Sequence, residues 1–306
     1  MNSVVLISNL KRIAIFFLKG LITLGLFIYF SQSIVREYKT AKFARLNSLL
    51  PSFDYFIKTV EEGGRFEPAA LKHYRDYFKQ VTKTIEGRAD AYGMLGFCEY
   101  YLGNIPQAIA AHQKAIKIKP DFFWFHYNLG MIYYKNNQYP EAVESFTKAI
   151  ETNLDINFKF MANSKIYLDI LTAVPSSEVL TDKIKTGYRD GFTMLVLSEY
   201  RLKNYSELIH LGQQAMSLRL GNEEFFLYYI GLALFRLNRY SQAVLFLNEA
   251  LKINRESPDA LYQLGLSLRA LGKEEAAQNF ISQSERLFKI NGTYFKMIDS
   301  MDLRAY

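Results

Sequence analysis

Side chains that could do chemistry are few and scattered along this chain. The four histidines, His73, His112, His126 and His210, share no spacing that zinc ligands use. The lone cysteine, Cys98, has no partner for an internal disulfide, so it does not decide the redox compartment. No HExxH, GxSxG, P-loop or dinucleotide-binding motif occurs. The sequence therefore predicts no enzyme, no metal site and no cofactor.

Charge gathers at the N-terminal end of the chain. Of a formal net charge of +7, the first 47 residues contribute seven basic side chains against one acid, Glu37. The rest of the chain is near neutral, which argues against nucleic acid as a partner. Basic residues beside an apolar run are typical of a segment at a membrane surface. Half of the residues are hydrophobic, which is enough for a real core.

The apolar run is IAIFFLKGLITLGLFIYF, residues 13–30, with Lys19 as its one charge. Its length predicts a transmembrane signal anchor over residues 13–35, after a short tail of residues 1–12. We expect a single-pass membrane protein with its later domains outside the cytoplasm. Two alternatives stay open. One is a signal peptide cleaved at Ser31-Gln32-Ser33, and the other is a buried or amphipathic helix of the fold.

After residue 88, small residues recur with a period of 34. The pairs that show this period are Gly96 and Gly130, Ala108 and Ala142, Ala115 and Ala149, Gly231 and Gly265, and Ala243 and Ala277. A period of this length is typical of stacked helix pairs. Gly and Ala let two helices approach closely, while larger neighbours fill the gaps.

The residues around these positions follow one pattern. His126-x-x-Leu129-Gly130-x-x-Tyr133, followed by Ala142, resembles the W-x-x-L-G-x-x-Y and Ala of the tetratricopeptide (TPR) repeat. Similar copies contain Leu95-Gly96, Ile230-Gly231 and Leu264-Gly265, and a weaker one contains Leu195-Val196. The resemblance covers residues 89–290. No copy carries the family's Trp, and residues 157–188 lack a Leu-Gly pair.

The resemblance implies an all-α solenoid of about five to six helix-turn-helix repeats. One helix pair cannot bury its apolar face alone, so neighbouring pairs must stack. The expected order after the anchor is a basic juxtamembrane segment with capping helices (36–87), repeats 1–2 (88–156), a degenerate repeat or spacer (157–188), repeats 4–6 (189–291) and a C-terminal cap (292–306).

In the TPR family, the first helices of successive repeats line a concave groove. The positions that face this groove are occupied here by Phe97, Tyr100, Tyr101, Trp124, Tyr127, Tyr134, Lys135, Tyr200, Arg201, Phe225, Tyr228, Phe235, Arg236, Tyr262 and Arg269. Aromatic rings offer contact area, and Arg pairs with carboxylates. The predicted partner is therefore a peptide segment or helix of another protein, with apolar anchors and some acid. The alternative is that many of these rings only pack repeat on repeat.

Together these features predict a membrane-anchored protein-interaction scaffold or assembly factor. Two alternatives stay open. The solenoid would act as an accessory subunit that orients an enzyme partner, or as an oligomerising structural component of a bacterial envelope assembly, such as a flagellar one.

Overall fold

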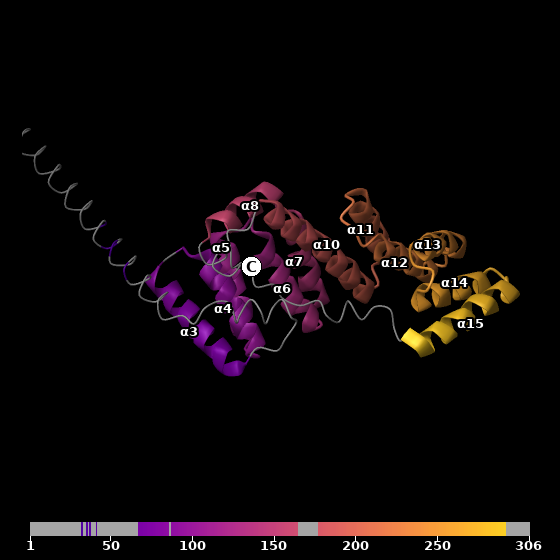
Figure 1. Ribbon diagram of the computed structural model, residues 1–306, viewed down its shortest axis with the longest axis horizontal. Coiled ribbons are helices and arrows are strands. Elements are labelled where there is room, and N and C mark those ends of the chain that lie inside the picture. Colours follow the sequence, from indigo (N-terminus) through magenta and orange to yellow (C-terminus); the bar gives the residue numbers. More distant parts are fainter. Residues whose placement is uncertain are drawn as a thin grey trace, which may run out of the picture.

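The described part of the computed structural model is an elongated stack of helices (Figure 1). It comprises residues 67–85, 87–164 and 177–291, with four single positions between residues 32 and 41. Twelve helices and no strand occur in these ranges. The helices follow one another from α3 at the indigo end to α15 at the yellow end, as the predicted solenoid requires.

Ten of the helices form five consecutive antiparallel pairs. Their bounds are α4 Ala89–Tyr101 with α5 Ile105–Ile118, α6 Phe123–Lys135 with α7 Tyr139–Ile150, α10 Ser177–Leu202 with α11 Tyr205–Ser217, α12 Glu223–Arg236 with α13 Tyr240–Ile253, and α14 Pro258–Ala270 with α15 Glu274–Asn291. Two further helices are α3, Pro68–Thr84, which packs on α4, and α8, Leu154–Asn163.

Each pair turns through one residue in the left-handed backbone conformation. These residues are Gly103, Asn137, Lys203, Asn238 and Gly272, with φ between 59° and 80°. Gly and Asn adopt this conformation at little cost, and they commonly end helices. Lys203 is the exception in the series, because a Lys side chain is strained there.

The predicted small residues are the points of closest approach within a pair. A Cβ on Gly130 would lie 2.8 Å from the ring of Phe146, and a Cβ on Gly231 would lie 2.7 Å from Leu247. In the α10–α11 pair, the small and the large residue of this contact have exchanged positions. Buried Val196 stands where the other repeats have Gly, and Gly212 stands sixteen residues later, where they have a large side chain. This exchange explains why the weaker copy lacks its Gly.

Two Glu residues replace the expected Tyr for a structural reason. Glu99 accepts a hydrogen bond of 2.7 Å from the side chain of Asn104, and Glu199 accepts one of the same length from Asn204. Each Asn directly precedes the second helix of its pair, so the contact closes the turn. Burial raises the pKa of Glu199, against the hydrogen bond from Asn204.

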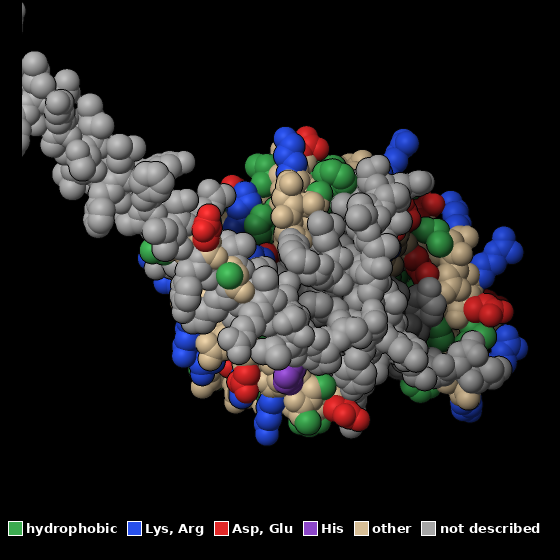
Figure 2. All heavy atoms as spheres, turned by 60° about the vertical axis from the view of Figure 1, so that its left-hand side comes forward, with side chains coloured by type: hydrophobic (Ala, Val, Ile, Leu, Met, Phe, Trp, Pro, Cys, Tyr) green, Lys and Arg blue, Asp and Glu red, His purple; other side chains and the backbone are tan. Residues whose placement is uncertain are grey.

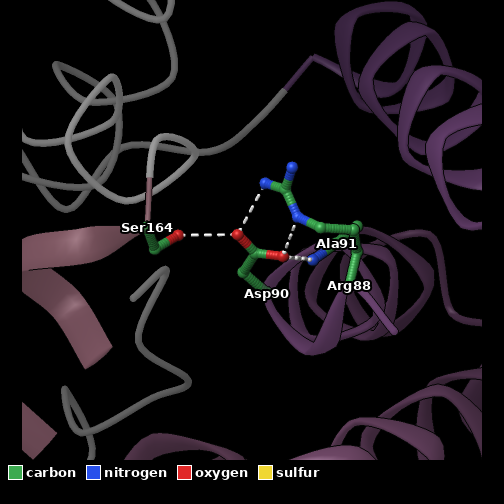
Figure 3. A network of polar contacts seen from close by, with 4 residues as sticks. All are labelled: Arg88, Asp90, Ala91 and Ser164. Atoms are coloured by element: carbon green, nitrogen blue, oxygen red, sulfur yellow. Dashed lines mark hydrogen bonds and ion pairs between the residues drawn. The ribbon is translucent and has the colours of Figure 1, made fainter. Parts of the chain in front are cut away.

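The segment without a repeat signature leaves the regular stack. Helix α8 joins the earlier repeats through Asn157, whose Oδ1 accepts a hydrogen bond of 2.7 Å from the Phe123 amide. Its end at Ser164 donates a hydrogen bond of 2.7 Å to Asp90, which also binds Arg88 and the Ala91 amide (Figure 3). Residues 165–176 lie outside the described residues.

Helix α10 then resumes the stack against α7. It runs from Ser177 to Leu202, so it continues without a break past residue 188, the predicted end of the degenerate segment. A Cβ on Gly187 would lie 2.5 Å from Trp124, and one on Gly191 would lie 3.3 Å from Phe123. These two glycines, one helical turn apart, let α10 lie close against the aromatic start of α6.

The predicted single-pass membrane localisation needs correction. No helix in the part of the chain that the structure describes combines the length and apolar character that a bilayer crossing requires. The longest, α10, has 26 residues but carries charged side chains such as Asp182, Lys185 and Arg189. The predicted anchor at residues 13–35 lies outside the described residues, apart from Gln32 and Val35, as do the tail, most of residues 36–87 and the C-terminal cap.

Candidate functional site

The fifteen predicted groove residues differ in how much of their side chain reaches solvent. Four are buried: Phe97, Trp124, Tyr127 and Phe225. Six are half-buried: Tyr100, Tyr101, Tyr134, Tyr200, Tyr228 and Phe235. Five are exposed: Lys135, Arg201, Arg236, Tyr262 and Arg269. Only the half-buried and exposed side chains offer surface to a partner.

The buried rings of α6 pack within the solenoid. Trp124 and Tyr127 meet edge to face with ring centroids 5.5 Å apart, and Tyr127 also meets Phe146 at 5.8 Å. Their exposed fractions are 1% and 0%. They therefore stabilise the junction with α7 and α10, as the packing alternative for these rings expects.

Five side chains from three first helices come together, and we call them the tyrosine–arginine cluster. They are Tyr134 of α6, Tyr200 and Arg201 of α10, and Tyr228 and Tyr229 of α12. Tyr200 and Tyr229 meet edge to face at 5.6 Å, and Tyr228 and Tyr229 at 5.2 Å. Interaction with the Tyr134 hydroxyl raises the pKa of Arg201, so Arg201 of α10 lies near Tyr134 of α6. The cluster thus joins three consecutive repeats.

Electrostatics make the cluster a neutral aromatic surface with a basic rim. Burial raises the pKa of both Tyr228 and Tyr229 above the usual range, and the Asp259 carboxylate adds to that rise. The positive charge of Arg236 lowers the pKa of Tyr228, and that of Arg201 lowers the pKa of Tyr229, so both arginines partly offset the rise. Tyr228 and Tyr229 therefore stay protonated at neutral pH, and a protonated hydroxyl can donate a hydrogen bond.

The remaining predicted residues lie in separate groups. Phe97, Tyr100 and Tyr101 pack together on α4, with centroids 4.7 Å and 5.1 Å apart. Tyr262 lies on α14 beside exposed Phe288, at a cleft of about 490 Å³ between α14 and α15. The structure therefore brings only part of the predicted groove into one site.

A recurring contact across the turns is a feature that the sequence analysis missed. Aromatic residues five positions apart meet at three turns: Tyr134 with Tyr139 at 5.4 Å, Tyr200 with Tyr205 at 6.1 Å, and Phe235 with Tyr240 at 5.3 Å. In the last helix pair, α14–α15, the equivalent positions are occupied by Arg269 and Glu274, which form an ion pair of 3.0 Å. The spacing of five between aromatic residues, found at the same place in three repeats, was the available signal.

Charged side chains are otherwise mixed over the surface. In the view of Figure 2, basic, acidic and hydrophobic side chains are interspersed over the coloured part of the molecule. Within residues 67–85, 87–164 and 177–291, no three side chains of His, Cys, Asp or Glu converge as metal ligands would. Burial raises the pKa of the Cys98 thiol, which keeps it protonated and poorly reactive.

Comparisons with known proteins agree with the helix pairs. The family model described as TPR repeat matches residues 98–137 and 231–272, and the one described as tetratricopeptide repeat matches residues 123–155. These ranges therefore match tetratricopeptide repeats. The matched ranges contain the turn of the first pair, the whole second pair, and the chain from the middle of α12 to the α14–α15 turn, so the predicted TPR resemblance is confirmed there.

Two curated TPR proteins are similar to this chain. A tetratricopeptide repeat domain-containing chloroplast protein of Arabidopsis thaliana is 25% identical over 174 residues, which is 55% of this chain. A TPR repeat-containing protein of Methanocaldococcus jannaschii is 23% identical over 209 residues, or 68% of this chain. The matched parts span 53% and 33% of those relatives' own lengths.

Two solved structures are similar to this chain. YrrB matches with a TM-score of 0.50 and 16% identity, over 73% of this chain and 96% of YrrB. MamA matches with a TM-score of 0.49 and 16% identity, over 65% of this chain and 98% of MamA. The likeness to YrrB, at this identity, bears on the fold alone.

Proposed function

We propose that this TPR protein is an interaction scaffold or assembly factor that holds a segment of a partner protein against the first helices α6, α10 and α12. The observation that carries the proposal is the tyrosine–arginine cluster. It offers half-buried rings from three successive repeats, together with the exposed cation of Arg201. Tyr and Arg side chains of this kind dominate binding energy at protein interfaces.

The chemistry of the cluster suits a protein segment better than a small molecule. The rings extend across three helices, so they form a track and do not close around a compact ligand. Tyr hydroxyls donate hydrogen bonds to backbone carbonyls, and the ring faces accept apolar side chains. YrrB is described as a TPR protein with an unusual peptide-binding site, which supports a peptide as the kind of partner to test first.

The described residues hold no observation that favours an enzyme partner or an oligomeric structural role over a general scaffold. Aromatic residues other than those of the cluster remain predictions as partner contacts. Tyr262 is the strongest of these, since 47% of its side chain is exposed.

Site-specific photocrosslinking in the native cells tests the proposal. A photoreactive phenylalanine analogue replaces Tyr228 in one variant and Leu245 in a control, because Leu245 lies on the second helix α13 and is 64% exposed. We expect position 228 to capture one dominant partner that position 245 does not. Both variants must first show the wild-type helix content by circular dichroism.

The proposal fails if position 228 captures no partner, or the same mixture as position 245. A second variant, Tyr200→Ala, separates packing from binding, because loss of the crosslink with an unchanged urea midpoint places Tyr200 in the binding surface. A lowered midpoint together with a retained crosslink would assign Tyr200 to packing instead.

A further inference from the structure

We infer that the partner segment is acidic and extended, and that Lys135, Arg201 and Arg236 bind its carboxylates one repeat at a time. This inference rests on the proposed function and names the chemistry of the partner. The three cations form what we call the basic row. Each lies five residues after the close-approach position of its own repeat, which is occupied by Gly130, Val196 and Gly231.

Equivalent positions place the basic row along one line of the solenoid. Lys135 is the last residue of α6, Arg236 is the last residue of α12, and Arg201 lies one residue before the end of α10. All three side chains are exposed. Arg201 lowers the pKa of Tyr229, and Arg236 lowers the pKa of the adjacent Tyr228. The row therefore runs beside the tyrosine–arginine cluster.

Three arginines of the repeats, Arg88, Arg189 and Arg269, have a carboxylate partner among the described residues, and the cations of the basic row do not. Arg88 binds Asp90 at 2.7 Å, Arg189 binds Asp190 at 3.2 Å, and Arg269 binds Glu274 at 3.0 Å. Within the described ranges, no ion pair joins any of the three row cations to an acid. Asp259 is the one acid that acts on the cluster's tyrosines, so the rim keeps a positive charge.

Arg201 is the best prepared of the three. Interaction with Tyr134 raises the pKa of Arg201, and a guanidinium held near this ring loses less conformational entropy when a carboxylate binds. The surrounding rings exclude water on one side, and a charge pair is stronger where water is partly excluded. Arg201 is therefore expected to contribute more to binding than Lys135 or Arg236.

The spacing of the row limits the shape of the partner. Packed helices lie about 8–10 Å apart, and a polyproline II strand advances about 9 Å in three residues. An acidic side chain at every third position of an extended segment would thus meet successive repeats. Apolar or aromatic residues between the acids would lie on the tyrosines.

Fluorescence anisotropy with synthetic peptides tests this inference on the full chain. The probes are labelled peptides of about twelve residues, enough to span three helices. One has Glu at every third position with Leu and Pro between, a second has Gln in place of Glu, and a third has the same Glu content at every second position. We expect the first peptide to bind at least about tenfold more tightly than the Gln peptide, with affinity falling as salt rises.

Arginine variants localise the effect. Arg201→Gln together with Arg236→Gln should abolish the preference for Glu over Gln, and Arg286→Gln, an exposed Arg of α15, should preserve it. All variants must keep the wild-type urea midpoint. Arg201→Lys keeps the charge but loses the planar guanidinium, and should lower affinity for the Glu peptide severalfold.

Each outcome decides between the two proposals. Equal binding of Glu and Gln peptides, or an unchanged preference in the double variant, overturns the acidic inference and leaves the groove function standing. Absence of Glu-peptide binding up to about 1 mM also overturns it. Photocrosslinking at position 228 decides the proposed function independently of these peptides.

Discussion

The imidazole of His112 lies against the backbone of Gly96, where a Cβ would be 2.7 Å from its Cδ2 atom. His112 is fully buried on α5, and neither ring nitrogen has a hydrogen-bond partner in the described structure. The same position of the later pairs holds Phe146, Leu247 and Ile281. A polar ring thus occupies an apolar packing position.

Replacing this ring by an apolar side chain should stabilise the fold. We expect His112→Leu to raise the free energy of unfolding by about 1–2 kcal/mol, because it removes unsatisfied buried polar atoms. Urea unfolding followed by circular dichroism measures the change. The control is His210→Leu, whose side chain is 71% exposed and which should change stability little. A loss of stability in His112→Leu would show that the ring is a needed polar group.

His112 should also make stability fall in acid. Burial lowers its pKa from 6.5 to about 3, so the folded protein keeps the ring neutral while the unfolded chain protonates it below pH 6.5. The unfolded state then binds more protons, and stability is lost as pH falls from about 6.5 toward 3. His126, whose pKa is also lowered mainly by burial, adds a loss of the same sign.

The contribution of His112 is isolated by difference. Between pH 7 and pH 5, the stability advantage of His112→Leu over wild type should grow by about 2 kcal/mol, at about 1.4 kcal/mol per unit of pKa shift. Urea midpoints at both pH values measure it. The same variant in a His126→Gln background should show the same growth, and an advantage independent of pH would contradict the assignment.

Gly130 should tolerate no side chain beside Phe146. A Cβ there would lie 2.8 Å from the ring, and overpacking outweighs the higher helix propensity of Ala. We expect Gly130→Ala to lower the free energy of unfolding by about 1–2 kcal/mol. Gly191→Ala is the graded comparison, because its nearest neighbour, a methyl of Ile150, would lie at 3.1 Å. An equal loss in both variants would contradict a contact-specific cause.

The features that could be predicted from the sequence are those that repeat every 34 residues. The spacing of 34 located the helix pairs, because close-approach positions demand small residues whatever the rest of the chain does. It did not locate α8, whose contacts through Asn157 and Ser164 reach other repeats and leave no periodic trace.

The candidate site was only partly predictable for the same reason. Trp124 occupies a groove position of its repeat, yet the first half of α10, which lacks a repeat signature, covers it at Gly187. Tyr229 was missed although it contacts Tyr200, because side-chain reach across three repeats cannot be read from spacing within one. Which rings face a partner depends on how successive pairs are rotated, which is a property of the assembled stack.

Among the turns within the described helix pairs, Lys203 is the residue whose type opposes its backbone. It has φ 61° and is exposed at the α10–α11 turn, where the equivalent positions hold Gly103, Asn137, Asn238 and Gly272. A non-glycine side chain in this conformation costs about 1–2 kcal/mol. We expect Lys203→Gly to stabilise the protein by about 1 kcal/mol, with Lys203→Asn giving part of that gain.

The Lys203 prediction has a built-in control at Lys135. That residue ends α6 with ordinary helical geometry, so Lys135→Gly should destabilise by up to about 1 kcal/mol while removing the same charge. Urea midpoints of the three variants and wild type measure both effects. If Lys203→Gly destabilised as Lys135→Gly does, the left-handed turn would impose no strain on Lys203. Opposite signs would establish that the α10–α11 turn is held in place by tertiary packing against an unfavourable local residue.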